Sequence, residues 1–138
     1  MFNGKLWVMG GYSNDGLMAD VWSATDLFTW EKITATAPWP ARIGAGCTVF
    51  DGKLWIMGGD NGTVAPTSDV WSTSDGITWT QVAASAPWPA GTVQATTFNN
   101  HLVVLTRGIA WENHAQVWQS ADGVTWECLT NTPTSCGM

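Results

Sequence analysis

Residues 107–114 carry the most varied chemistry in the sequence, because eight consecutive positions gather a cation, an aromatic ring, a carboxylate and an imidazole. Side chains of these types suit a polar pocket for a ligand. Arg107, Trp111, Glu112 and His114 are therefore candidate ligand-binding residues. The alternative is that the segment is relaxed sequence with no function, and both interpretations stay open.

Two Pro-Trp-Pro segments, 38–40 and 87–89, provide a second set of candidates. Proline on both sides stiffens the backbone, so Trp39 and Trp88 would be rigid aromatic platforms for a sugar ring or for a side chain of a partner protein. Arg42 follows the first segment and joins the candidates. The alternative is that both tryptophans fold back and fill a seam between neighbouring structural units.

Two short polar segments complete the candidate site, one at 12–15 and one at 60–63. Tyr12 and Asp60 are its candidate ligand contacts. The Asp-Asn-Gly-Thr sequence of the second segment resembles a fragment of a calcium loop and also a glycosylation acceptor at Asn61. Asp-Asn-Gly is above all turn chemistry, however, so we expect a turn here and no metal site.

The inventory of reactive side chains argues against catalysis. The chain has one tyrosine, two histidines and two arginines, and it lacks a nucleophile elbow, a phosphate-binding glycine loop and zinc-ligand spacing. A carboxylate pair for glycoside hydrolysis stays open, because Asp15, Asp60 and Glu112 are expected on one rim, but acidic residues in surface turns are the ordinary explanation. We therefore predict no enzyme activity and no cofactor.

Composition limits the class of protein and of partner. A chain of 138 residues is ordinarily one domain, and its net charge of −6 with only five Lys and Arg argues against binding nucleic acid or an anionic membrane. No stretch approaches the roughly 18 to 20 apolar residues of a membrane span. Eleven tryptophans, fifteen glycines and six prolines indicate many turns between short apolar strands rather than long helices.

The three cysteines leave at least one thiol unpaired in a monomer. Cys128 and Cys136 are close enough in sequence to close a small loop in an oxidising compartment, although spacing alone is weak evidence. Cys47 aligns with Ala95 in the repeat described next, which favours a small buried residue.

An internal repeat organises the whole chain. The segment Phe2 to Gly11 returns 48 residues later as Phe50 to Gly59, and a decayed copy begins at Phe98. A second segment, Asp69 to Trp79, places two tryptophans eight positions apart around a polar turn, and it also occurs three times, with Trp22 and Trp118 as the equivalents of Trp71. The repeat units are approximately 1–43, 44–92 and 93–138.

Each complete unit is predicted to contain four strands joined by hairpins, which we name inner, second, third and outer. In the second unit these cover about 45–50, 53–57, 68–73 and 78–83. The second strands are apolar on both faces, so each sheet should be covered on both sides. Four-stranded sheets that cover one another by repetition are blades of a β-propeller, which makes the predicted fold class all-β.

These residues resemble kelch repeats. The marks are paired glycines at the end of the second strand, a strand beginning Asp-Val-Trp, and a tryptophan followed by Pro and Arg, and they are clearest in residues 44–92. The hairpin from Ser72 to Trp79 is partly similar to the Asp-box of sialidase-like propellers. In both families the signature residues mainly hold the blade together.

The enzymes of these families need residues that the chain lacks. A galactose oxidase-type copper site requires a Cys-linked tyrosine with further Tyr and His ligands, but Tyr12 is the single tyrosine. A sialidase requires three arginines and a tyrosine nucleophile, but only Arg42 and Arg107 exist.

The number of blades is unusual, because closed propellers have about 4 to 8 and this chain supplies three, the first without its inner strand. Bare apolar end faces favour association, so we expect a homodimer that closes a six-bladed ring. A piece of a longer protein, or an engineered half, is the alternative.

The expected function is a non-catalytic binding module for protein or glycan. Its site would be the rim where the outer-to-inner and second-to-third connections emerge together. A structural propeller piece without a ligand, and a glycoside-acting enzyme, are the alternatives.

Overall fold

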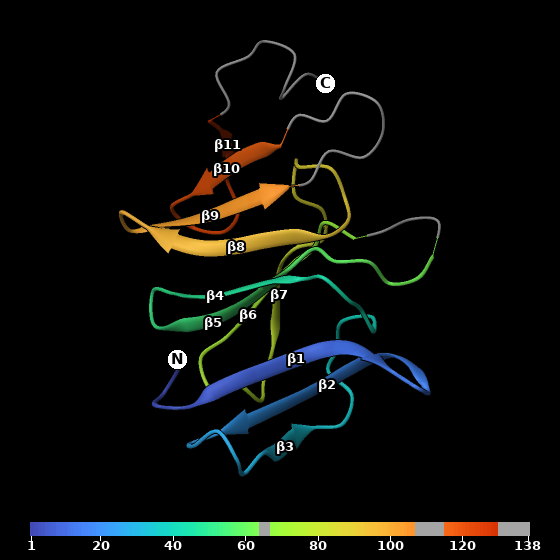
Figure 1. Cartoon of the computed structure of the whole chain (residues 1–138). Helices are drawn as coiled ribbons and strands as arrows, with labels where there is room; N and C mark the ends of the chain where they lie inside the picture. Colours follow the sequence, from blue (N-terminus) through green and yellow to red (C-terminus); the bar gives the residue numbers. More distant parts are fainter. Residues whose placement is uncertain (64–66, 107–114, 130–138) are drawn as a thin grey trace.

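Three antiparallel sheets make up the chain, in a computed structural model that describes residues 1–63, 67–106 and 115–129. Figure 1 shows the sheets stacked one on another in chain order. We call them blades 1, 2 and 3. Blade 1 contains β1 (Leu6–Ser13), β2 (Gly16–Ala24) and β3 (Glu31–Thr34). Blade 2 contains β4 (Gly46–Phe50), β5 (Lys53–Met57), β6 (Val70–Thr73) and β7 (Thr80–Ala83). Blade 3 contains β8 (Val93–Phe98), β9 (His101–Thr106), β10 (Gln116–Ser120) and β11 (Glu127–Cys128).

This arrangement confirms the predicted all-β propeller blades and their order. In blades 2 and 3 each strand pairs with its sequence neighbour, from inner to outer. Blade 1 has three strands, and only Phe2, bridged to Lys5, represents the inner one. No helix of the described residues is long and apolar enough to cross a membrane.

The turns between inner and second strands follow the sequence signals. Asn3-Gly4, Asp51-Gly52 and Asn99-Asn100 all have positive φ at both positions, between 47° and 70°. Two such residues form the two-residue hairpin that matches the twist of the flanking strands. Asn, Asp and Gly tolerate this conformation best, which is why the turns were predictable.

The Trp-turn-Trp hairpin is held by its aspartate. The Asp75 carboxylate accepts the backbone N–H groups of Ile77 and Thr78, both at 2.8 Å. These hydrogen bonds lower the pKa of Asp75 from 3.8 to about 2. Asp26 and Asp122 make the same bonds in blades 1 and 3, and their pKa values are lowered for the same reason. The repeated aspartate is therefore a turn residue.

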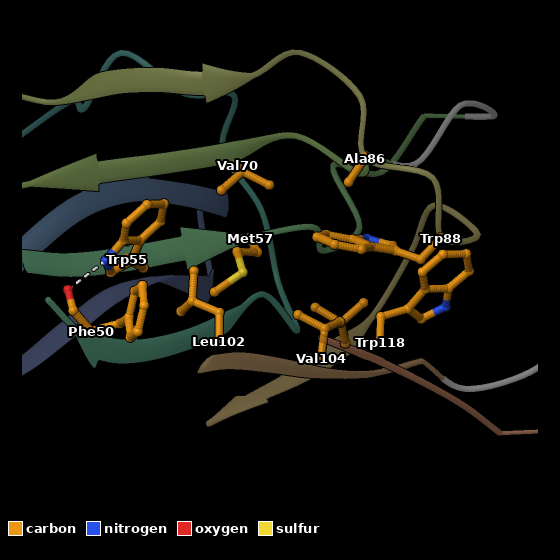
Figure 2. Close-up of a cluster of buried hydrophobic side chains, with 10 residues drawn as sticks. Phe50, Trp55, Met57, Val70, Ala86, Trp88, Leu102, Val104 and Trp118 are labelled. Carbon is orange, nitrogen blue, oxygen red and sulfur yellow. Dashed lines mark hydrogen bonds between the residues drawn. The ribbon is translucent and has the colours of Figure 1, made fainter. Parts of the chain in front are cut away.

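Two hydrophobic cores fill the seams between blades. β5 contributes to both: Leu54 and Ile56 face blade 1, whereas Trp55 and Met57 face blade 3. Figure 2 shows the second core, in which Trp55 and Met57 meet Leu102 of β9. These four apolar side chains of β5 are buried, which confirms that a strand apolar on both faces is covered on both sides.

Cys47 differs from the expectation, because it is exposed and free rather than buried. It lies on β4, the innermost strand of blade 2, where an open cavity of about 520 Å³ separates it from β1. Blade 1 has no inner strand to cover that place. The suggested Cys128–Cys136 bridge involves residue 136, which lies outside the described residues.

Candidate functional site

The linker from blade 1 to blade 2 crosses the end of β1 at the paired glycines. Gly11 donates its N–H to the carbonyl of Arg42 at 2.8 Å, and Arg42 donates its own N–H to Met18 at 3.0 Å. A side chain at Gly10, whose φ is +63°, would meet the Arg42 carbonyl oxygen at 2.8 Å. The glycine pair therefore permits the close approach of two backbones.

The same linker is fixed to blade 2 on its other side. Ile43 and Asp60 exchange backbone hydrogen bonds of 2.9 and 2.8 Å. Asp60 also accepts the N–H of Gly62 at 2.8 Å, which is the turn chemistry expected for the Asp-Asn-Gly segment. A Cβ at Gly62 would lie 3.0 Å from the side chain of Leu17, so the loop abuts the β1–β2 hairpin of blade 1.

Tyr12 and Asp60 consequently stand on either side of one rigid linker. Tyr12 follows Gly11 and is 71% exposed, Ile43 is 45% exposed between them, and Asp60 is exposed. Asp15 is also exposed, at the tip of the β1–β2 hairpin. We call the exposed side chains of Tyr12, Asp15, Ile43 and Asp60 the rim. The sequence pointed to the two loops but missed Ile43, which has no distinguishing signal in the repeat.

The two Pro-Trp-Pro tryptophans do not belong to the rim. They are not exposed platforms; the alternative, that both fold back and fill a seam, is what the structure shows. Trp39 and Trp88 are each only 2% exposed. Trp39 packs edge-on against Trp79 of blade 2, and Trp88 against Trp126 of blade 3, with ring centroids 4.3 Å apart in both pairs. Burying a large aromatic side chain is worth more than presenting it to water, so the stiff loop directs the ring into the seam.

Arg42 is not available to a ligand either, because its side chain is 1% exposed. Its guanidinium makes a two-pronged pair with the Asp69 carboxylate, at 2.6 and 2.8 Å, and also donates to the Gly58 carbonyl at 2.7 Å. Burial would raise the pKa of Asp69, but hydrogen bonds from Arg42 and Trp71 outweigh it and hold the pKa below 3.8.

A signal for this ion pair is present in the sequence. Blade 3 has Gly91 at the position of Arg42 and Gln116 at the position of Asp69, so both charges are lost together. Paired loss is expected of residues that neutralise each other in a buried seam.

The remaining candidates, Arg107, Trp111, Glu112 and His114, lie outside the described residues. Within residues 1–63, 67–106 and 115–129, no three His, Cys, Asp or Glu side chains gather to hold a metal ion. The rim offers two carboxylates, one aromatic ring and one aliphatic side chain. Groups of these kinds can bind a ligand.

Comparison with known proteins agrees with this architecture. Residues 41–72 match the Kelch motif, which spans the linker at Arg42, the Gly58-Gly59 pair and Asp69 to Ser72. No curated protein matches the sequence.

Among solved structures, a GH32 beta-fructofuranosidase of Bombyx mori is similar, with a TM-score of 0.69 and 18% sequence identity. The similarity covers 94% of this chain and 33% of that one, so the chain spans about a third of the length of the structure it matches. At this identity the likeness concerns the fold. The chain is therefore an array of β-propeller blades, and residues 41–72 of it match the Kelch motif.

Proposed function

We propose that the chain is a non-catalytic binding module of the kelch propeller type, and that its recognition surface is the rim around Tyr12 and Asp60. One observation carries the proposal. Tyr12 and Asp60 occupy the same position of two successive repeats, each directly after a Gly-Gly pair, yet one is aromatic and the other acidic. Blade architecture does not require either residue, and both are exposed.

Part of the rim backbone is anchored, which favours affinity because less ordering is needed on binding. Backbone hydrogen bonds tie both rim loops to the linker residues Arg42 and Ile43. Their side chains thus start from fixed positions. By contrast, Trp39 and Trp88 pack in the seams, so removing either ring would lower the stability of the fold.

The chemistry of the rim favours a protein partner that presents a basic segment. Asp15 and Asp60 supply carboxylates, and the Tyr12 ring suits a cation over its face. Among the described residues, Lys5 and Lys53 follow the hairpin turns at the opposite end of the blades, Lys32 on β3 lies beside Asp20, and Arg42 is buried. The net charge of −6 adds long-range attraction for a basic partner.

An array of basic peptides and glycans tests the proposal. We expect the full chain to bind basic peptides, and Tyr12→Ser and Asp60→Lys each to abolish that binding. Ile77→Ser is the matched control, because Ile77 is 62% exposed at the opposite end of blade 2. Binding confined to glycans would replace the protein partner by a carbohydrate. An array without any binding would support the alternative of a structural propeller piece.

The non-catalytic assignment rests on the inventory of reactive side chains given above. A glycoside-acting enzyme would instead hydrolyse model glycosides in a manner that depends on Asp15 or Asp60. We expect no such turnover from the purified chain.

A further inference from the structure

Each seam joins two unlike faces. We call the face that a blade turns toward the next blade its leading face, and the opposite one its receiving face. In the second seam the leading face of blade 2 includes Phe50, Trp55 and Met57, and the receiving face of blade 3 includes Leu102 and Val104. The first seam repeats this pattern 48 residues earlier, with Phe2, Trp7 and Met9 against Leu54 and Ile56.

Two faces have no partner among the described residues: the leading face of blade 3 and the receiving face of blade 1. Phe98 is 66% exposed, whereas its equivalents Phe2 and Phe50 are 3% and 5% exposed. Val8 is 48% exposed, whereas its equivalent Ile56 is fully buried. These side chains keep the apolar character of the seam although no blade among the described residues packs on them.

The difference in exposure between end blades and interior blades occurs at seam positions and not at an exposed turn position that all three blades share. The position after Leu27, Gly76 and Gly123 in the three turns holds Phe28, Ile77 and Val124, and it is exposed in every blade. Exposure there is a property of the turn. Exposure at Phe98 and Val8 reflects an absent neighbour, since the equivalent residues in the interior seams are buried.

The two free faces also match each other in size. In both interior seams a tryptophan of the leading face fills the space left by a turn glycine: Trp7 covers Gly76, and Trp55 covers Gly123. At the free faces the corresponding residues are Val103 and Leu27. The large residue has become smaller and the glycine has become larger, so the combined volume is kept. Such reciprocal change is expected only if the two positions meet.

The aspartate at the edge of the receiving face also has a cation beside it in blades 1 and 2. Interior Asp69 takes its cation from Arg42 of the preceding linker. Asp20, its equivalent in blade 1, lies 3.9 Å from Lys32 of its own blade, where blade 2 has Gln81. The receiving face of blade 1 therefore needs no arginine from the blade that covers it.

From these features we infer that a second copy of the chain covers both free faces. The leading face of blade 3 of one copy packs on the receiving face of blade 1 of the other, and the twofold repeats this contact. Closed propellers have about 4 to 8 blades. Two copies give six blades and place Val103 opposite Leu27 twice. This assembly does not depend on the proposed binding function.

Sedimentation velocity of the whole chain tests the ring. We expect a species of about twice the 14.8 kDa chain mass at micromolar concentration. Val103→Trp overfills the seam and Leu27→Gly leaves a hole in it, so each should raise the dimer dissociation constant about tenfold or more. The double variant restores the tryptophan-glycine pair of the interior seams and should recover most of the loss.

Phe28→Ser is the matched control and should leave the dissociation constant unchanged, because this position is exposed in every blade. Circular dichroism checks that each variant is folded. A wild-type monomer would overturn the inference, and so would a mass that grows without limit, which indicates an open filament. A double variant that associates no better than Val103→Trp alone would also overturn it.

Discussion

Arg42 makes four hydrogen bonds with its side chain in a place that excludes water: two to Asp69, one to Gly58 and one to Pro40. A buried pair of this kind contributes little net stability over an apolar pair, but the loss of one member leaves an unpaired charge. The residue therefore specifies how the linker seats on blade 2.

Arg42→Gly is expected to lower the free energy of unfolding by about 3 to 5 kcal/mol, because it leaves the buried Asp69 carboxylate without a cation, although Trp71 still donates a hydrogen bond to it. Urea unfolding followed by tryptophan fluorescence measures this. Arg42→Gly with Asp69→Gln copies Gly91 and Gln116 of blade 3. This double variant should be more stable than Arg42→Gly, and the opposite order would contradict the role given to the pair.

The three turn aspartates predict the response to acid. The folded pKa of Asp75 is about 2 against an ordinary 3.8, and those of Asp26 and Asp122 are lowered too. Their contribution to stability is present above pH 3.8 and is lost as the pH falls through each lowered folded pKa, which for Asp75 is about 2, because protonation then favours the unfolded chain.

Replacing all three by asparagine, which does not titrate, should flatten the fall in stability over this range. Asp69, whose pKa is also lowered, accounts for the part that persists. Thermal unfolding at a series of pH values gives the measurement. An unchanged acid dependence in the triple variant would show that the turn carboxylates are not its source.

At the scale of the element, each hairpin of a blade is closed by its own turn residues, but the blade leaves two apolar faces. The seams cover these faces by complementary packing that is repeated: a tryptophan of one blade fits against a turn glycine of the next blade. The Pro-Trp-Pro linkers add one further tryptophan to each seam, which packs on Trp79 or on Trp126. Blade-to-blade packing thus uses most of the unusual tryptophan content.

Gly76→Ala tests the packing of a tryptophan on the turn glycine. The φ of Gly76 is +81°, and a Cβ there would collide with the Trp7 ring. Gly4→Ala is the control, since its φ is +70° but nothing lies within 4 Å of the added Cβ. Both should lose about 1 to 2 kcal/mol from the backbone, and Gly76→Ala about 1 to 3 kcal/mol more from overpacking. If chemical denaturation gave equal losses in the free energy of unfolding for the two variants, the seam would accommodate the added methyl group without overpacking.

Trp39→Ala should act on stability rather than on ligand binding. Removing a ring that is 2% exposed leaves a cavity against Trp79, so a loss of about 3 to 5 kcal/mol is expected. Phe28→Ala removes a ring that is 90% exposed and should change stability little. The near-ultraviolet circular dichroism of the paired tryptophans should diminish only in Trp39→Ala. A fully stable Trp39→Ala variant would contradict the seam role.

At the scale of the whole molecule, three blades are stacked with two filled seams between them. The two end faces carry apolar residues of the types that fill those seams. If a second copy covers those faces, folding is linked to association, and apparent stability depends on concentration. The rim of each copy would then lie in one ring with that of its partner.

The melting temperature is therefore expected to rise with protein concentration in the wild-type chain. In Val103→Trp this dependence should be weaker, because the end seam is impaired while the interior seams are unchanged. Differential scanning calorimetry at several concentrations provides the comparison. A melting temperature independent of concentration in the wild type would contradict the linkage.

Repetition in the sequence determined the fold to a large extent by itself. The spacing of 48 residues set the register of the blades, Asn-Gly and Asp-Gly marked the hairpins, and the doubly apolar β5 required cover on both faces. These features depend on local backbone preference and on hydrophobic pattern, which a sequence states directly.

Tertiary structure alone decided which of the candidate side chains face water. Trp39, Trp88 and Arg42 have the types of ligand contacts, yet they are buried, because the neighbouring blade offers a tryptophan edge or a carboxylate where the linker crosses it. Residue type and spacing along the chain do not encode that neighbour. The partner of a side chain in a seam comes from the next blade, and its identity follows only from how the blades pack.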